Sequence, residues 1–360
     1  MRHVLKIVFT YLLLVCGSNA AWSQLVTTGS GSVSANALVN NIIGSGVTFS
    51  NASYTGKPVA VGTFNGTASN IGLPSGVIIT SGHINVAPGP NNNGGATFSN
   101  NGPNIPELET LAQSTTYDGA ILEFDFVPQS NFVSFRYVFA SEEYNEYVCS
   151  EFNDAFAFFI TGPGITGTEN LAVVPSTTTP VTINTINNGS VGALGSIANS
   201  PCVLGNSAYF VGNSLNTVQY DGFTVVLTAQ RTVIPCQTYH IKLMIADGAD
   251  DIFDSAVFLE ENSFSSATYT VSVSTFFSDS TVYEGCTDAT VTFSRPDADP
   301  TPLTITYGVG GTATPGVDYV ALPGSITIPA GQTTVSFQVN GIADGLTEGS
   351  ETIIINANTP

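Results

Sequence analysis

Short runs of aromatic and β-branched residues, separated by glycine, proline and asparagine, recur along this chain and constrain its fold most strongly. No long stretch keeps the helical period of about 3.6 residues, whereas the short runs partly alternate, as half-buried strands do. Two weaker patterns predict helices at residues 106–112 and 35–43, the second capped by Ser34. The runs that predict strands are residues 132–139, 156–160, 224–228, 239–245 and 255–259. Many short strands between turns predict an all-β fold.

A small, polar segment at residues 262–267 separates two predicted domains. Residues 25–264 predict a large jelly-roll or sandwich-like β domain, a length that one all-β domain can reach. Residues 268–360 begin again with a strand pattern, and their length suits a smaller immunoglobulin-like β-sandwich.

Residues 1–23 have the pattern of a signal peptide. Arg2 and Lys6 supply positive charge, an apolar run at residues 7–15 follows, and small residues near Ala20 offer a cleavage site. That run is too short to span a membrane, and no later segment looks transmembrane. A lipoprotein site at Cys16 is an alternative, although such sites require a small residue before the cysteine. We expect a secreted or cell-surface protein.

The chain is strongly acidic, with 27 Asp and Glu against 7 Lys and Arg and a formal net charge of −20. Nucleic acids and anionic membranes are recognised by basic patches, so this charge argues against both as partners. The acids gather at residues 142–154 and 247–261. Carboxylates crowded without Lys or Arg repel one another unless a cation lies among them.

Oxygen-rich clusters of this kind suit Ca²⁺, which takes about 6–8 oxygen ligands. We therefore predict Ca²⁺ as a cofactor. The candidate ligands in the first domain are Asp247, Asp250, Asp251, Asp254, Glu142, Glu143 and Asp154. Two alternatives stay open: a solvated acidic face, or an Asx-rich turn whose side chains accept backbone N–H groups. The acidic spacing does not match an EF-hand loop.

The adjacent acids Glu142 and Glu143 also suggest a glycosidase, in which two carboxylates flank a sugar bond. Adjacent residues of an extended segment point to opposite faces, which disfavours that hypothesis. One of the pair is expected to bond Arg136, the lone base of a predicted strand. Because no nucleophile elbow, phosphate loop or HExxH motif occurs, we predict that the protein is not an enzyme.

Four cysteines follow the predicted signal peptide, and none forms a CxxC pair. In an oxidising compartment disulfides are expected. The first hypothesis is Cys202–Cys236 and the second is Cys149–Cys202. His240 lies within a predicted strand and is expected to be a packed residue. A carbohydrate site is a further hypothesis, with a stacking platform of tyrosines at Tyr117, Tyr137, Tyr144 and Tyr147.

An ordered series of segments in the first domain resembles the choice-of-anchor L domain over about residues 30–264. The matching segments are residues 75–82, 122–128, 135–144, 152–156, 219–227, 235–242 and 246–260. The resemblance implies a bacterial exported protein of a family whose members carry one of several C-terminal sorting signals. The resemblance therefore indicates where the protein is located more firmly than what it does, because the molecular activity of the family is poorly defined. No such sorting tail is visible before Pro360, so we expect either an anchor beyond this sequence or release of the protein.

The second domain resembles Calx-beta domains, which are immunoglobulin-like sandwiches. The matching segments are residues 282–285, 311–319, 324–331 and 348–351. Some members of that family bind Ca²⁺ at one end, and the motif match implies Glu284, Asp318 and Asp344 as ligands. Calcium-binding members usually have paired acids where this chain has Asp344 followed by glycine, so a purely structural module is an alternative.

Taken together, these features predict a non-catalytic, calcium-stabilised adhesion or matrix-interaction module at the cell surface. Its expected partner is an extracellular protein or polysaccharide. A carbohydrate-binding module is the alternative, and a glycosidase is the third hypothesis.

Overall fold

A computed structural model describes residues 24–199, 201–266, 269–276, 281–295, 302–343, 345 and 349–357. The predicted signal peptide at residues 1–23 therefore lies outside the described residues. Within them the chain is mostly β, as the sequence predicts, and every pairing between named strands is antiparallel.

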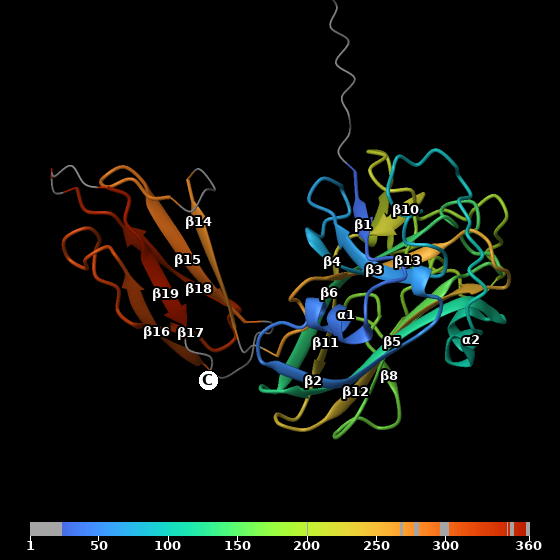
Figure 1. Ribbon diagram of the computed structural model, residues 1–360, viewed down its shortest axis with the longest axis horizontal. Coiled ribbons are helices and arrows are strands. Elements are labelled where there is room, and N and C mark those ends of the chain that lie inside the picture. Colours follow the sequence, from blue (N-terminus) through green and yellow to red (C-terminus); the bar gives the residue numbers. More distant parts are fainter. Residues whose placement is uncertain are drawn as a thin grey trace, which may run out of the picture.

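Two sheets form the body that Figure 1 draws in blue to yellow. The first sheet has the order β1 (Val26–Thr28), β3 (Val61–Asn65), β4 (Ser75–Thr80), β13 (Ser255–Glu260), β6 (Phe132–Ser141), β10 (Gly222–Thr224) and β9 (Phe210–Gly212), and β11 (Leu227–Thr232) also pairs with β6. The second has the order β2 (Val47–Thr55), β5 (Thr116–Pro128), β12 (Tyr239–Gly248), β7 (Ala155–Thr161) and β8 (Glu169–Asn170).

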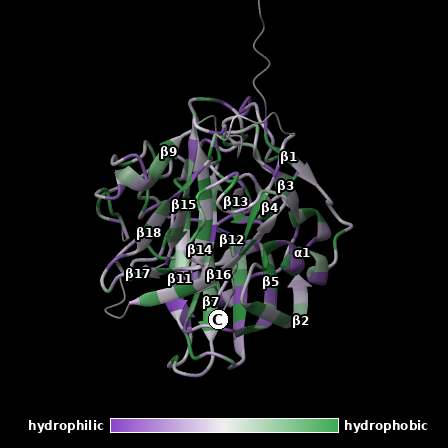
Figure 2. Cartoon of the chain, turned by 90° about the vertical axis from the view of Figure 1, so that its left-hand side faces the viewer, coloured by the Kyte–Doolittle hydropathy of each residue, from purple (hydrophilic) through white to green (hydrophobic). Residues whose placement is uncertain are grey.

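The main core lies between these two sheets. Phe124 and Phe126 of the second sheet pack against Phe264, which in turn stacks on Phe135 of the first sheet with ring centroids 5.0 Å apart. All four rings are buried. Burying such large apolar rings between two sheets is the main stabilising term of a sandwich. Figure 2 shows hydrophobic stretches, in green, along strands of this body and of the C-terminal region, which overlap in that view.

Smaller clusters cover the outer faces. On the first sheet, Ile78, Val138 and Phe258 belong to a second buried cluster. On the second sheet, Met244 lies in a cluster with Leu108 of helix α2 (Pro106–Ala112). Both faces of β13 are covered, so this strand reads as a nearly continuous apolar run, whereas β12 alternates at its start, where His240 and Lys242 face outward, and is buried on both faces from Leu243 on.

Both predicted helices are confirmed. Helix α1 (Ala35–Ile42) packs Leu38 and Val39 into the main core, and the Ser34 side chain caps it by accepting from the N–H of Ala37 at 3.3 Å. Two single 3₁₀ turns complete the helical content of the described residues, η1 (Pro58–Ala60) and η2 (Ser207–Tyr209).

The strand predicted at residues 224–228 is wrong, because the chain breaks there into β10 and β11. Phe223 pairs with Ala140 and Leu227 pairs with Tyr137, so four steps along this segment oppose three along β6. The extra residue forms a bulge. At that point the hydroxyl of Thr224 accepts the N–H of Phe139, replacing the missing backbone partner.

The C-terminal strands form two further three-stranded sheets, drawn in orange and red in Figure 1. Their orders are β14 (Thr270–Thr275), β15 (Asp288–Ser294), β18 (Thr334–Asn340), and β17 (Ser325–Ile328), β16 (Leu303–Gly311), β19 (Ile353–Ala357). Phe293, Tyr307 and Phe337 stack at the centre of their shared core. This core shares no residue with the other buried clusters of the described residues.

Candidate functional site

Antiparallel pairing places the ends of four central strands, β6, β7, β12 and β13, at the same end of the sandwich, where the strands of both sheets begin or finish. In the first sheet, Ser141 at the end of β6 pairs with Ser255 at the start of β13. In the second sheet, Ala246 near the end of β12 pairs with Ala155 at the start of β7. The acids lie next to these positions and form what we call the acidic core: Glu142, Glu143, Asp154, Asp247 and Asp254.

Hydrogen bonds join the two sheets at this edge. Asp154 accepts from the Ser255 hydroxyl at 2.6 Å, across the sandwich, and from the N–H of Gly248 at 3.0 Å. On the first sheet the N–H of Glu142 donates to the carbonyl of Asp254 at 3.1 Å. The structure therefore brings together, in space, two acidic segments that lie about a hundred residues apart in sequence.

Each acid of the acidic core exposes at most 1 % of its surface. A buried carboxylate is costly unless it is paired or bound to a cation. None of the ion pairs among the described residues includes these acids. The bases that form those pairs lie elsewhere: Arg136 with Glu260, Arg231 with Glu169, Lys242 with Glu107, and His240 with Glu123 and Asp125.

Several carboxylate oxygens of the acidic core lack a hydrogen-bond partner. Both oxygens of Glu142, both of Asp247 and one of Glu143 are buried in this state. The side chain of Gln219 and the N–H of Ala96 lie near Glu142, and the side chain of Ser81 lies near Asp247. Each offsets part of a pKa shift, but none makes a hydrogen bond of normal geometry to these oxygens. Native proteins rarely leave so many polar atoms unsatisfied, so these oxygens call for a ligand or a proton.

The pKa values of these acids also indicate that their negative charge is uncompensated. Burial raises the pKa of Glu142 to about 9 and that of Glu143 to about 11, and neighbouring carboxylates add to both shifts. Burial also raises the pKa values of Asp154 and Asp254 to about 7 and holds the pKa of Asp247 well above its usual range. Without a cation, part of the acidic core therefore stays protonated at neutral pH.

The predicted ligands Asp250 and Asp251 lie on the turn outside the acidic core. Asp250 is half-buried and accepts from the N–H of Ile252 at 3.3 Å, as an Asx turn does. Asp251 is exposed and accepts from the Ser99 hydroxyl at 2.8 Å. The geometry of Asp250 and Asp251 in this structure is that of the Asx-rich turn that the sequence analysis gave as an alternative to calcium binding.

Two further acids near the acidic core were not predicted as ligands. Asp118 is 3 % exposed and adds a raising influence to the pKa of Asp247 and of Asp254. Asp221 does the same for Glu142. Each stands alone in the sequence, so no acidic cluster marks it. The signal that could have found them is a repeated triplet, because both lie between a tyrosine and a glycine.

The acidic core offers hard oxygen donors, which fit Ca²⁺ rather than a softer transition metal. Within the part of the chain that the structure describes, no three Asp, Glu, His or Cys side chains already stand in the arrangement that ligates one ion. Binding an ion therefore requires carboxylates to rotate toward a common centre.

A glycine makes room for one of these carboxylates. A Cβ atom on Gly82 would lie 1.7 Å from a carboxylate oxygen of Asp254. That carboxylate also accepts from the N–H of Phe98 at 3.0 Å. Asp254 is thus fixed by contacts from two loops that are distant from it in sequence.

The predicted C-terminal ligands are placed in part. The N–H of Gly285 donates to the carbonyl of Gly341, and the N–H of Ile342 donates to the carbonyl of Asp318, so the segments carrying Glu284 and Asp318 flank residues 341–342. Glu284 is exposed, and Asp318 is 9 % exposed. Asp344 lies outside the described residues.

A disulfide anchors the loop that carries Glu142 and Glu143. It joins Cys149 to Cys202, so the second pairing hypothesis is confirmed and Cys202–Cys236 is wrong. Cys236 is exposed in the turn before β12, where its N–H bonds Pro128 at the far end of β5. It therefore lies at the opposite edge of the sheets from the acidic core.

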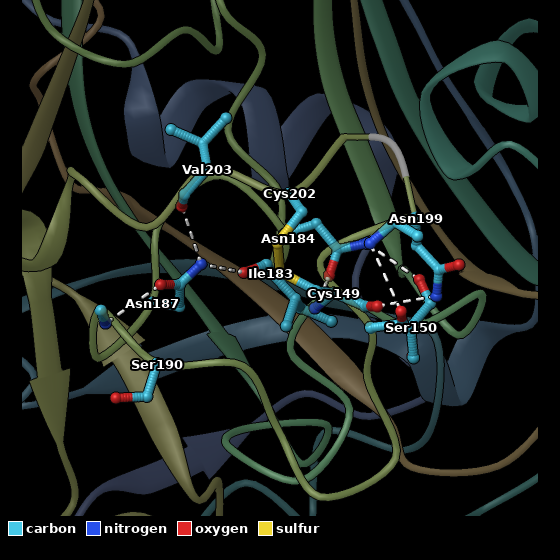
Figure 3. Close-up of a disulfide and its surroundings, with 12 residues drawn as sticks. Cys149, Ser150, Ile183, Asn184, Asn187, Ser190, Asn199, Cys202 and Val203 are labelled. Carbon is cyan, nitrogen blue, oxygen red and sulfur yellow. Dashed lines mark hydrogen bonds between the residues drawn. A yellow bond between two sulfur atoms is a disulfide. The ribbon is translucent and has the colours of Figure 1, made fainter.

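Asparagines reinforce this anchor (Figure 3). Asn184 accepts the N–H of Cys149 and donates to the carbonyl of Ser150 at 3.0 Å. Asn199 donates to the carbonyl of Cys149 at 2.8 Å. The long connection between β8 and β9 thus holds the acidic loop by a covalent bond and by side-chain amides.

Two predictions about basic residues are wrong. Arg136 pairs with Glu260, on the neighbouring strand β13, and not with Glu142 or Glu143. Arg136 lies in the middle of β6, whereas Glu142 and Glu143 follow the end of that strand. The side chain of Arg136 is therefore too far from both acids to bond them.

His240 is partly exposed rather than packed in the core. Its ring nitrogens contact Asp125 at 2.7 Å and Glu123 at 3.2 Å, on the outer face of the second sheet. The alternation of β12 places it there, because the residues on either side of it, Tyr239 and Ile241, point into the core.

Comparison with known proteins adds one match. The family model of the choice-of-anchor L domain matches residues 26–265. No curated protein and no solved structure matches the chain. A choice-of-anchor domain implies a surface-associated or secreted bacterial protein. Among the described residues, no helix is both long and apolar enough to cross a membrane.

Proposed function

The chain belongs to the choice-of-anchor L family, and from that premise we propose that it is a non-catalytic surface module that calcium stabilises. In this proposal Ca²⁺ binds among the acids of the acidic core and neutralises them. The ordered loops then present a surface to an extracellular protein or polysaccharide.

The observation that carries the proposal is the set of buried, unpartnered oxygens on Glu142, Glu143 and Asp247. A solvated acidic face would leave its carboxylates in water, whereas these are at most 1 % exposed. The same burial speaks against a glycosidase at Glu142 and Glu143, because a substrate could not reach them.

The C-terminal region is proposed as a Calx-beta-like spacer. Its calcium ligands in this proposal are Glu284, Asp318 and Asp344. The support is that Glu284 and Asp318 flank one segment at residues 341–342.

The test is thermal unfolding of the protein against free Ca²⁺. Ligand that binds only the folded state at a hundredfold excess over Kd stabilises it by about 2.7 kcal/mol. For a domain of this size we expect a Tm rise of about 5–10 °C, reversed by EDTA. Glu142→Gln and Asp247→Asn should strongly reduce the rise, because an amide cannot supply the charge that binds a cation.

Glu151→Gln is the matched control. Glu151 is an exposed acid on the same loop, so its loss should leave the calcium response unchanged. A Tm that does not respond to Ca²⁺ in the parent protein contradicts the proposal. A response that the Glu151 and Asp247 variants lose equally would also contradict it, because it would show general screening of charge.

A further inference from the structure

An open, polar cleft lies at the start of β5, next to the acidic core. Its volume is about 300 Å³, and three segments wall it: the loop carrying Ser99, Asn101 and Asn104, the start of β5 with Tyr117 and Asp118, and Asp251. Across the β5–β12 pairing Tyr117 is the direct partner of Asp247. The cleft and the acidic core therefore share a wall.

Hydrogen bonds hold the cleft in shape. Asp118 accepts from the N–H groups of Asn100 and Gly102 at 2.8 and 2.9 Å. The hydroxyl of Thr116 donates to the side chain of Asn104 at 2.8 Å. Ser99 ties the loop to Asp251 at 2.8 Å. A site whose polar groups are already positioned loses less entropy when it binds a ligand.

The lining selects a class of ligand by its chemistry. Side-chain carboxylates, amides and hydroxyls provide most of it, and none of the described residues that line the cleft is basic. A phosphate, sulfate or uronate would meet Asp118 and Asp251 without a countercharge. Asp118 is buried and holds the loop, whereas one oxygen of the exposed Asp251 accepts from Ser99 and the other can accept a hydroxyl of the ligand.

Tyr117 supplies the apolar face. It is 41 % exposed at the cleft, whereas Tyr137 and Tyr144, two other tyrosines of the predicted stacking platform, are fully buried. An exposed aromatic ring beside convergent hydrogen-bonding groups matches a sugar, which has an apolar face and a rim of hydroxyls. The volume lies at the small end of ligand sites, which span about 300–1,000 Å³.

We propose that this cleft binds an uncharged glycan, with Tyr117 stacked on one sugar ring and the exposed Asp251 and asparagine amides bonding its hydroxyls. The inference rests on the proposed surface function and names its ligand class. Because Tyr117 pairs with Asp247, calcium in the acidic core orders one wall of the cleft. Glycan and calcium therefore strengthen each other's binding.

The experiment applies the full chain, in Ca²⁺, to an array of neutral hexose and pentose oligosaccharides printed beside sulfated and uronic-acid glycans. We expect saturable binding to at least one neutral glycan, competed by the same free oligosaccharide. Tyr117→Ala should weaken it about tenfold, the factor that corresponds to about 1.4 kcal/mol. Tyr117→Phe, which keeps the ring, should restore most of the binding. Phe276→Ala, at a ring that is 78 % exposed in the C-terminal region, is the matched control.

The outcomes separate the two proposals. Binding confined to anionic glycans, equal loss in Tyr117→Ala and Phe276→Ala, or no binding by calcium-saturated protein overturns the glycan site, whatever the thermal response to Ca²⁺. Binding of a cationic peptide at the cleft, with no binding of any sugar, would overturn the glycan site as well, because it would show that the cleft selects positive charge. Glycan binding that survives EDTA unchanged supports the cleft and overturns its coupling to calcium. Tyr117→Ala should keep the full calcium-induced rise in Tm, which shows that the variant is folded.

Discussion

At the scale of single residues, the acids found from sequence divide according to their neighbours. The crowding of Glu142 and Glu143 without bases predicted a cation site, and the structure shows both carboxylates buried without a countercharge. Asp118 and Asp221 were missed, since only the fold brings these isolated acids to the same edge. Asp250 and Asp251 lie on the turn outside the acidic core, because adjacency in sequence does not make the side chains of a turn converge.

Gly82 gives a residue-scale prediction. Because an added Cβ would overlap the carboxylate of Asp254, Gly82→Ala must displace that side chain. We expect a loss of about 1–3 kcal/mol in the free energy of unfolding, the usual cost of overpacking, together with a smaller calcium response. Urea unfolding with and without Ca²⁺ measures both.

The matched control is Gly205→Ala, because a Cβ on Gly205 would meet nothing within 4 Å. It should change the stability little. If Gly82→Ala proves as harmless as Gly205→Ala, the side chain of Asp254 is not packed as described.

At the scale of elements, strong local sequence patterns were enough to predict most of the central strands and both helices. Strands β6, β7, β12 and β13 and both helices follow from apolar runs, turn residues and a capping serine. The break between β10 and β11 could not be foreseen. The groups that bond Thr224 and Val225 there, the N–H of Phe139 and the carbonyl of Tyr209, belong to segments that are distant in sequence. The pairing of Cys149 with Cys202 likewise depends on which loops meet in space.

The disulfide supports an element-scale prediction. It closes a loop with a sequence separation of 53 residues. In the loop-entropy model, losing a crosslink of that length costs about 4 kcal/mol. We expect the double variant Cys149→Ser/Cys202→Ser to unfold at lower denaturant concentration and to bind Ca²⁺ more weakly, because the anchored loop carries Glu142 and Glu143.

Denaturant unfolding and calcium titration by calorimetry measure the two effects. Cys236→Ser removes an exposed cysteine at the other edge of the sheets and should alter neither. Unchanged calcium affinity in the double variant would show that the disulfide stabilises the fold without positioning the acids.

At the scale of the whole molecule, the excess of acids affects stability, and the family match indicates the location. The choice-of-anchor L match and the net charge of −20 both fit a protein that works outside the cell. The sequence thus predicted fold class and location, because these depend on composition and long patterns. The proposed glycan ligand combines Tyr117, which the sequence already offered, with a cleft whose walls come from segments far apart in the chain.

The pH dependence of stability follows from the raised pKa values. In EDTA the folded protein keeps protons on Asp154, Asp254 and Glu142 that the unfolded chain releases above about pH 4. Their stabilising contribution is therefore complete below that pH and is lost as the pH rises through about 7 and then about 9. We expect Tm in EDTA to fall between pH 5 and about pH 9, and saturating Ca²⁺ to weaken that fall. A Tm that rises over this range in EDTA would show that the acids are ionised and satisfied without metal.

The most direct measurement is a crystal structure of the full chain grown in abundant Ca²⁺, with anomalous scattering used to identify ions. The account predicts an ion among the acids of the acidic core, with oxygens of Glu142, Glu143 or Asp247 at about 2.3–2.6 Å from it. Well-ordered acids that hold only water or one another's protons, with no ion between them, would contradict the account.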